Sequence, residues 1–191
     1  AVKGERSFIP EVNGHKNALE LVEQVVNMNE GNYLEEDLRN PVETEFCIGV
    51  AGYPEKHQEA PNTTSDLKYL KQKVDAGADY IVTQMFFDNQ KYFDFVNKCK
   101  SAGITVPIIP GLKPIATKKQ LNLIPHRFKV DLPADLIMEI VRCKDNKAVR
   151  KVGIEWCTQQ SKELVAAGVP ILHYYSMGRS SNINAIAKEI F

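Results

Sequence analysis

A cluster of residues able to bind a ligand follows a short apolar run near residue 50. Gly52, Tyr53 and Pro54 follow the run 46–51, and a polar loop that contains His57 comes next. Small residues let other atoms approach the backbone, while a phenol and an imidazole can contact a phosphate or a ribose. An isolated loop histidine is more commonly a solvated residue, so the segment on its own leaves both interpretations open.

A glutamine interrupts the next apolar run. Gln84 lies within residues 80–87, which are otherwise apolar or aromatic. A buried amide that finds no hydrogen-bond partner costs about 1–3 kcal/mol. Gln84 therefore either binds a ligand, for which it can both donate and accept, or is satisfied by the neighbouring backbone. The aromatic pairs Phe86-Phe87 and Tyr174-Tyr175 are more typical of a core and its rim.

The elements that position these residues alternate between strand and helix. Strands are predicted at 46–51, 80–87, 106–112 and 170–175, and helices at 14–28, 66–75, 88–103, a short stretch from 117, 133–143, 146–167 and 180–190. Asp88 and Thr117 are the predicted N-caps of two of these helices, and Phe95 lies on the predicted inner face of the first. Such a strand–helix–strand order predicts parallel strands. In α/β folds, ligands bind at the carboxyl ends of these strands, and the polar residues gather there. No Gly-x-Gly-x-x-Gly motif is present, so a Rossmann dinucleotide site is not predicted.

Composition and charge narrow the class of protein. The chain has 191 residues, 43% of them hydrophobic and 25% charged, which is typical of one globular domain. Its 24 basic and 24 acidic residues cancel, so nothing favours nucleic acid or a membrane surface as partner. Without a membrane-length apolar run or a signal peptide, a cytoplasmic location is expected. The dispersed cysteines, with no Cys-x-x-Cys, predict free thiols and no metal site; they are Cys47, Cys99, Cys143 and Cys157.

Three motifs in a fixed order resemble bacterial methylenetetrahydrofolate reductase. They are AGYPEKH at 51–57, DLKYLKQKVDAGA at 66–78 and TQMFFD at 83–88. The likeness continues through IPGLKP at 109–114 and HYYSMGR at 173–179. It covers about residues 46–191, which we interpret as one domain. Residues 1–45 resemble the family only loosely and are interpreted as a leading segment, a helix and an acidic insertion.

The resemblance implies a fold larger than this chain displays. The family has a (β/α)8 TIM barrel, whereas four strands are predicted here, so the chain is expected to supply about the last four βα units. An open half of a barrel exposes two strand edges. It should therefore associate with another copy, forming a homo-oligomer, or require the other half. The start of the chain, which has no methionine, is interpreted as a cut end.

The resemblance also implies an activity and a set of ligands. The family reduces 5,10-methylenetetrahydrofolate to 5-methyltetrahydrofolate, using FAD as cofactor and NAD(P)H as hydride donor. Gln84 would face the flavin and bind the folate and the nicotinamide in turn, and Gln120 and Arg179 would contact the folate tail. The positions implied for FAD are Ala51, Tyr53, His57, Ala60, Asp66, Tyr69, Gln72 and Lys73.

Some family features have no match here. Tyr69 and Gln72 replace a common asparagine and arginine, and Ile124 lies near the position of a phenylalanine that stacks on the substrate. The family's proton-donating glutamate and the aspartate near its flavin have no counterpart. We therefore assign no catalytic residue and expect that the chain alone does not turn over.

Two other functions compete with this one. The chain could be a non-catalytic half-barrel fragment or interaction module that holds no flavin, and the presence of bound flavin would distinguish the two. An unrelated α/β-barrel lyase or phosphate-binding protein is disfavoured by the ordered motifs.

Overall fold

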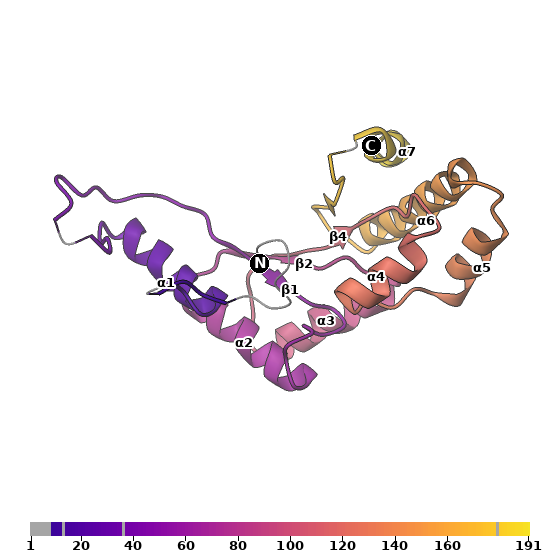
Figure 1. The fold of residues 1–191 in the computed structure, drawn as a ribbon. Helices are drawn as coiled ribbons and strands as arrows, with labels where there is room; N and C mark the ends of the chain where they lie inside the picture. Colours follow the sequence, from indigo (N-terminus) through magenta and orange to yellow (C-terminus); the bar gives the residue numbers. More distant parts are fainter. Residues whose placement is uncertain (1–8, 13, 36, 179) are drawn as a thin grey trace.

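The computed structural model describes residues 9–12, 14–35, 37–178 and 180–191, which form both helices and strands (Figure 1). The helices are α1 (Ala18–Asn29), α2 (Thr63–Asp75), α3 (Asn89–Ser101), α4 (Gln120–Phe128), α5 (Ala134–Arg142), α6 (Asn146–Ala166) and α7 (Ser180–Ile190). The strands are β1 (Gly49–Gly52), β2 (Tyr80–Thr83), β3 (Ile108–Ile109), β4 (Gly111–Leu112) and β5 (His173–Tyr174). The predicted α/β class is confirmed.

All strand pairs are parallel, as the sequence predicted. β2 lies between β1 and β3, with Val50 opposite Ile81, and β4 pairs with β5. The predicted strand 106–112 is divided at Pro110, which has no N–H to donate to a ladder. After Pro110 the chain changes partners, and the Gly111 N–H donates to Oγ1 of Thr83 at 2.9 Å. A Cβ on Gly111 would overlap the Thr83 carbonyl oxygen, so a glycine is required at this crossing.

The first core lies between β1–β3 and the helices α1–α3. Val50 and Ile81 point from the strands to this side, where they pack with Leu70 of α2 and Phe95 of α3. In Figure 1, α2 and α3 run along this side of the strands. Ala51, the neighbour of Val50, is exposed on the other side. The alternation along β1 thus separates a helix-covered face from an open one.

Two further cores join α4–α7 to the strands. Leu136, Ile140 and Val149 are fully buried between α4, α5 and α6. α7 packs on α6, with Ile186 and Leu164 both completely buried.

Two contacts of α6 fix it against the segments that follow β2 and β4. Trp156 of α6 donates its Nε1–H to the Phe87 carbonyl at 3.0 Å. Gly153 packs directly on the Ile115 backbone, where any Cβ would overlap the carbonyl oxygen. A helix can approach a backbone this closely only at a glycine.

Several element boundaries differ from the sequence predictions, and side-chain capping explains two of them. α1 begins at Ala18, four residues later than predicted, because the Asn17 side chain accepts the Leu19 and Glu20 N–H groups. α2 begins at Thr63, three residues earlier than predicted, because Asn62 caps it. The predicted cap Asp88 of α3 is confirmed, since its side chain accepts the Gln90 N–H.

Other predictions near the strands were wrong in position. β1 begins only at Gly49, so Cys47 precedes the strand and is exposed instead of lying within it. β2 ends at Thr83, so Gln84 follows the strand, although its N–H still donates to the Gly52 carbonyl at 2.8 Å. Pairing stops there because β1 itself gives way to the Tyr53-Pro54 loop.

Another difference concerns α4. The predicted short helix extends to Phe128, with Pro125 inside it, and its N-cap is Lys119. Thr117 contributes its backbone carbonyl, which accepts the Gln120 N–H at 3.1 Å, and not a side-chain cap.

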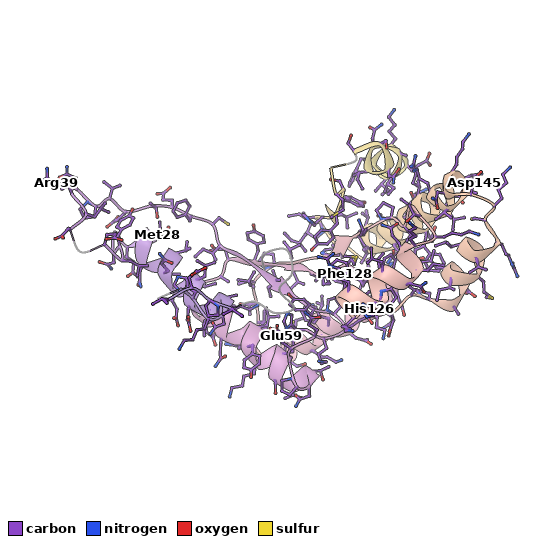
Figure 2. All side chains as sticks on the ribbon, in the orientation of Figure 1. Met28, Arg39, Glu59, His126, Phe128 and Asp145 are labelled. Carbon is purple, nitrogen blue, oxygen red and sulfur yellow. The ribbon has the colours of Figure 1, made fainter. Side chains whose placement is uncertain are left out.

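Residues 30–48 run back from α1 to β1 without a helix or strand in their described part. Figure 2 shows Arg39 at the far end of this segment, beyond Met28 of α1. Asn29 of α1 fixes the part of this segment that leads back to β1, because its Oδ1 accepts hydrogen bonds from the Thr44 hydroxyl and the Phe46 N–H, both at 2.8 Å. Within the described residues, none of the helices combines the length and the apolar character needed to cross a membrane.

Candidate functional site

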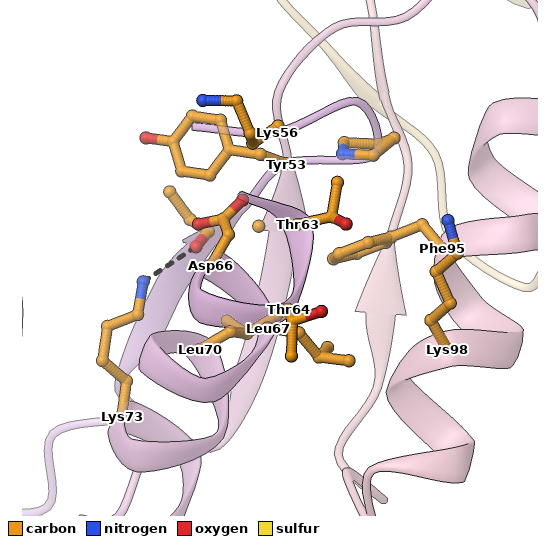
Figure 3. Close-up of a pocket in the computed structure, with 13 residues that line it drawn as sticks. Tyr53, Lys56, Thr63, Thr64, Asp66, Leu67, Leu70, Lys73, Phe95 and Lys98 are labelled. Atoms are coloured by element: carbon orange, nitrogen blue, oxygen red, sulfur yellow. Dashed lines mark hydrogen bonds between the residues drawn. The ribbon is translucent and has the colours of Figure 1, made fainter. Parts of the chain in front are cut away.

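A cavity of about 260 Å³ opens where β1 ends, between the first turns of α2 and the helix α3 (Figure 3). Gly52 forms part of its wall, and Leu67 and Leu70 of α2 supply apolar surface. Its remaining lining residues are Ala51, Tyr53, Pro54, Lys56, Thr63, Thr64, Asp66, Lys73, Phe95 and Lys98. The cavity lies at a strand's carboxyl end, as the sequence predicted for a ligand site.

Lys73 reaches the cavity from the fourth turn of α2. Its Nζ donates to the Ala51 carbonyl at 3.0 Å, as the dashed line in Figure 3 marks. Burial lowers the pKa of Lys73, and the nearby Asp66 carboxylate partly offsets that effect. A lysine ammonium carries three N–H groups, so one contact with a carbonyl leaves others for an anion.

Asp66 joins α2 to the loop that follows β1. Its Oδ2 accepts the backbone N–H of His57 at 2.8 Å. The His57 ring meets the Tyr53 ring edge to face, with centroids 4.5 Å apart. Burial raises the pKa of Tyr53, and the charges of Asp66 and other neighbours raise it further. At neutral pH, Tyr53 is therefore a neutral phenol that can donate a hydrogen bond.

Lys56 completes this loop, and the sequence analysis did not single it out. Its φ of 146° is one that residues with a side chain rarely adopt. Its Nζ donates to the carbonyls of His57 at 2.9 Å and Ala60 at 2.5 Å. These contacts bury Ala60 and fix the loop's course. No spacing pattern marks such a lysine, because the contact depends on the unusual backbone.

The predicted cofactor residues divide into two groups in the structure. Ala51, Tyr53, Asp66 and Lys73 line one cavity, and His57 and Ala60 belong to the loop beside it. In contrast, Tyr69 is 52% exposed and Gln72 is also exposed, and neither lines the cavity.

The cavity also includes α3 residues that the sequence analysis missed. Phe95 and Lys98 lie three residues apart, so they share one face of α3. Figure 3 shows both on the side of the cavity opposite Lys73. The helical spacing was visible in the sequence, but Phe95 had been interpreted only as part of the inner face of the helix.

Gln84 and Gln120, the two glutamines predicted to contact folate, both use the side-chain oxygen to accept backbone N–H groups. Oε1 of Gln84 accepts the N–H of Met85 at 3.0 Å, which is the backbone contact that the sequence analysis considered as an alternative. Oε1 of Gln120 accepts the N–H groups of Ala116 at 2.6 Å and Thr117 at 3.0 Å. Each side-chain NH₂ makes no hydrogen bond with the described residues, so it can donate to a ligand.

The remaining predicted substrate contact, Arg179, lies outside the described residues. Ile124 is 1% exposed and packs in the core, away from solvent.

The cysteines contribute no reactive group to the cavity. All four are free thiols, and burial raises the pKa of Cys99 to about 11 and that of Cys157 to about 12. Among the residues that the structure describes, no three His, Cys, Asp or Glu side chains gather in a way that could bind a metal ion. The chemistry available at the cavity is therefore charge, hydrogen bonding and stacking.

Known proteins with a similar sequence share one description. The family model for methylenetetrahydrofolate reductase matches residues 1–190, which includes the first 45 residues. The Escherichia coli 5,10-methylenetetrahydrofolate reductase is 40% identical over 147 residues, 76% of this chain and 50% of that protein. A probable methylenetetrahydrofolate reductase (NADH) of Oryza sativa is 38% identical over 98% of this chain and 31% of that protein. The chain thus spans half or less of the length of these relatives.

A solved structure supports the fold. The Clostridium thermocellum protein, uncharacterized but described as binding two copies of 5-methyl-5,6,7,8-tetrahydrofolic acid, superposes with a TM-score of 0.50. It is 20% identical in sequence, and the match covers 75% of this chain and 52% of that one. This likeness concerns the fold, and the family follows from the family model and the sequence relatives: the chain belongs to the methylenetetrahydrofolate reductase family.

Proposed function

We propose that this chain is part of a flavin-dependent enzyme that reduces 5,10-methylenetetrahydrofolate to 5-methyltetrahydrofolate with NAD(P)H as donor. The observation that carries the proposal is the convergence of Ala51, Tyr53, Asp66 and Lys73 on one cavity. These residues come from two motifs of the family, and the chain brings their side chains together at a strand's carboxyl end.

The cavity residues fit one end of FAD. The Lys73 ammonium suits a pyrophosphate, and Asp66 can accept hydrogen bonds from ribose hydroxyls. Tyr53 offers a flat ring and a phenol donor beside them. Binding pockets for drug-sized ligands range from about 300 to 1,000 Å³. A cavity of about 260 Å³ therefore accommodates part of a dinucleotide, whose remainder would extend along the strand ends.

The chain's own residues would bind and orient the reactants. A bound flavin supplies the hydride transfer between donor and folate. Gln84 offers its amide NH₂ at the end of β2, where it can serve the folate and the nicotinamide alternately. Gln120 and Arg179 are proposed for the folate tail, with the guanidinium facing a carboxylate. No residue of this set transfers the proton, so we expect ligand binding without turnover from the chain alone.

The proposed architecture is the last four βα units of a (β/α)8 barrel. The described strands form two parallel sheets, β1-β2-β3 and β4-β5, and β1 and β5 are each an edge strand with a pairing partner on one side only. Ala51 is exposed on the face away from the helices. These edges support pairing with further strands, in a second copy or in another segment, and light scattering would measure the former.

A flavin titration tests the proposed function. We expect the chain to quench FAD fluorescence on binding, and Lys73→Met to weaken the affinity about tenfold, since hydrogen bonds to charged groups contribute about 1.5–3 kcal/mol. Lys68→Met is the matched control, because Lys68 is an exposed lysine of the same helix that does not line the cavity. Equal affinity in the Lys73 variant would contradict the assigned role.

The competing function is a non-catalytic module without flavin. It predicts no FAD binding by any variant. Binding of 5-methyltetrahydrofolate that needs no flavin and is lost in Gln84→Ala would support a partial folate site in such a module. NADH oxidation by the chain with menadione as acceptor would contradict the expectation of binding without turnover.

A further inference from the structure

The loop after β1 is tied mainly to its own side of the molecule. Lys56 donates to two carbonyls within the loop, and Asp66 of α2 accepts the His57 N–H. These contacts fix the loop relative to α2. They do not connect it to the segment that follows α4, which lines a small space together with Gln84.

Glu55 makes that connection. Its Oε2 accepts the backbone N–H of Asp131 at 3.0 Å, across 76 positions of sequence. Asp131 follows Val130, which is 3% exposed, and Lys129, where α4 ends in the left-handed conformation. The donor of this hydrogen bond, the Asp131 N–H, therefore belongs to a segment that is already fixed by the buried Val130 and by the end of α4.

Gln84 lies where these two segments meet. A space of only about 10 Å³ remains between them, and Tyr53, Glu55, Gln84, Phe128 and Val130 are among its walls. Gln84, whose side-chain amide is proposed to bind folate, thus lines the same space as Glu55 of the loop and Val130 of the segment after α4. A change in the Glu55–Asp131 contact would alter the space at Gln84.

The charges around Glu55 make this contact sensitive to protonation. Burial raises the pKa of Glu55 to about 7; the Asp131 carboxylate also raises it, while the Asp131 N–H and Lys91 lower it. Lys91 of α3 lies 3.5 Å from Oδ2 of Asp131. The other titratable groups around the same space are Tyr53, Lys56 and Lys129. When protonated, Glu55 can donate to the Asp131 carboxylate, and when ionised it repels that group.

We propose that Glu55 is a positioning residue: the hydrogen bond that its carboxylate accepts from the Asp131 N–H joins the loop after β1 to the segment after α4 beside Gln84, and a change in its protonation alters this contact. The contact itself is a property of the described structure. Its consequence for folate or nicotinamide binding rests on the proposed function. Glu55 would act through the position of Gln84 and of the loop, without touching the reacting atoms.

NMR of the isotope-labelled chain tests the proposal without any ligand. We would follow the Asp131 backbone amide and the Gln84 side-chain amide between pH 5.5 and 8.5. Both signals should shift together with one midpoint near 7. Glu55→Gln should abolish this midpoint and keep the Asp131 amide protected, because the glutamine oxygen can still accept its N–H. Glu55→Ala should abolish the midpoint and speed exchange of that amide about tenfold.

Glu59→Gln is the matched control, since Glu59 is an exposed carboxylate of the same loop. It should titrate as the unaltered chain does. A midpoint that persists in Glu55→Gln would assign the titration to another group and overturn the proposal. An Asp131 amide that does not respond to pH would do the same. If Glu55→Ala does not fold, the isosteric Glu55→Gln decides alone.

The flavin titration separates this proposal from the proposed function. A titration of Asp131 and Gln84 in a chain that binds no FAD would refute only the cofactor role. FAD binding without that titration would refute only the role of Glu55.

Discussion

The two ends of the molecule use their helices differently. The region of β1–β3 and α1–α3 packs one core beneath its strands and keeps an open cavity at their carboxyl ends. The region of α4–α7 is filled by contacts between helices, and Gly153 allows α6 to touch a backbone segment directly. The described cavity lies in the first region, and the second is stabilised mainly by contacts between its helices.

This difference indicates how stability and function are divided. The loop after β1 is stabilised by side chains that contact backbone groups, as with Lys56 and Asp66. Such contacts are individually modest, about 0.5–1.5 kcal/mol, or about 1.5–3 when a charge is involved. Packing of α6 and α7 buries Leu164 and Ile186 completely. We therefore expect substitutions in the second region to affect folding and those in the first to affect binding.

The largest expected effect is that of Gly153→Ala. The added Cβ would overlap the Ile115 carbonyl oxygen, which is backbone and cannot rotate away. We expect a loss of about 4 kcal/mol or more in the free energy of unfolding, measured by urea denaturation. Lys151→Ala, at an exposed position of the same helix, should change it by less than about 0.5 kcal/mol. An unchanged urea midpoint for Gly153→Ala would show that α6 can move aside.

Truncation of one leucine in each region compares their packing directly. Leu164→Ala should cost about 3 kcal/mol, because its side chain is wholly enclosed. Leu70→Ala should cost about 2 kcal/mol, because Leu70 borders the existing cavity and loses fewer contacts. Both values come from chemical denaturation. An equal loss of unfolding free energy in the two variants would mean that Leu70 is packed as tightly as Leu164 despite the neighbouring cavity.

Asp66→Ala should affect the first region in both stability and binding. Removing the carboxylate leaves the His57 N–H without its partner and should cost about 1.5 kcal/mol. It should also weaken FAD binding, which the flavin titration measures. Asp75→Ala, at the exposed end of α2, should leave the affinity for FAD unchanged. If both variants bind equally, the loop does not need Asp66 to hold its place.

The helix caps offer a closely matched pair. Asn62 accepts the Ser65 N–H at the start of α2, and Asp145 accepts the Ala148 N–H at the start of α6, both at 2.8 Å. Each change to alanine should cost about 1 kcal/mol in thermal or urea unfolding. Only Asn62→Ala should also weaken FAD binding, because α2 carries the cavity residues. An equal effect of both caps on affinity would contradict the division between the regions.

The smallest expected effect is a pH dependence of stability. Glu55 in the folded chain has a pKa of about 7, above its ordinary value of 4.5, so the folded state holds more protons between these values. The free energy of unfolding should therefore fall as the pH rises from 4.5 to 7 and then level off. Glu55 is only partly buried, so solvent screening limits its share to under about 1 kcal/mol. Glu55→Gln should remove this share of the slope in urea titrations at successive pH values.

The sequence was sufficient to predict the parts of the fold that depend on local patterns. Helical spacing located α2, α3 and α6, and the Asp88 cap followed from its side-chain chemistry. The ordered motifs identified the family and four residues that line the cavity. Each of these features depends on residues that are close together in the sequence, so it can be recognised without knowledge of the tertiary contacts.

What the sequence did not predict depends on contacts between distant residues. Beyond Pro110, the Gly111 N–H donates to Thr83 of β2, a contact across 28 positions that no spacing pattern reveals. The Glu55–Asp131 bond spans 76 positions, and no spacing rule connects the two residues. Gln84 was expected within a strand because the apolar run continues to Phe87. That run instead leaves the sheet to supply side chains to the core.

The hydrogen bond from Trp156 to the Phe87 carbonyl gives the chain a built-in optical reporter. Trp156 is the only tryptophan in the sequence, so all indole emission comes from this one position. Its ring lies half-buried where α6 meets the residues that follow β2. Separation of these segments would expose the indole to water and move its emission to longer wavelength. Stopped-flow fluorescence can therefore time the joining of the two regions during refolding without an added label.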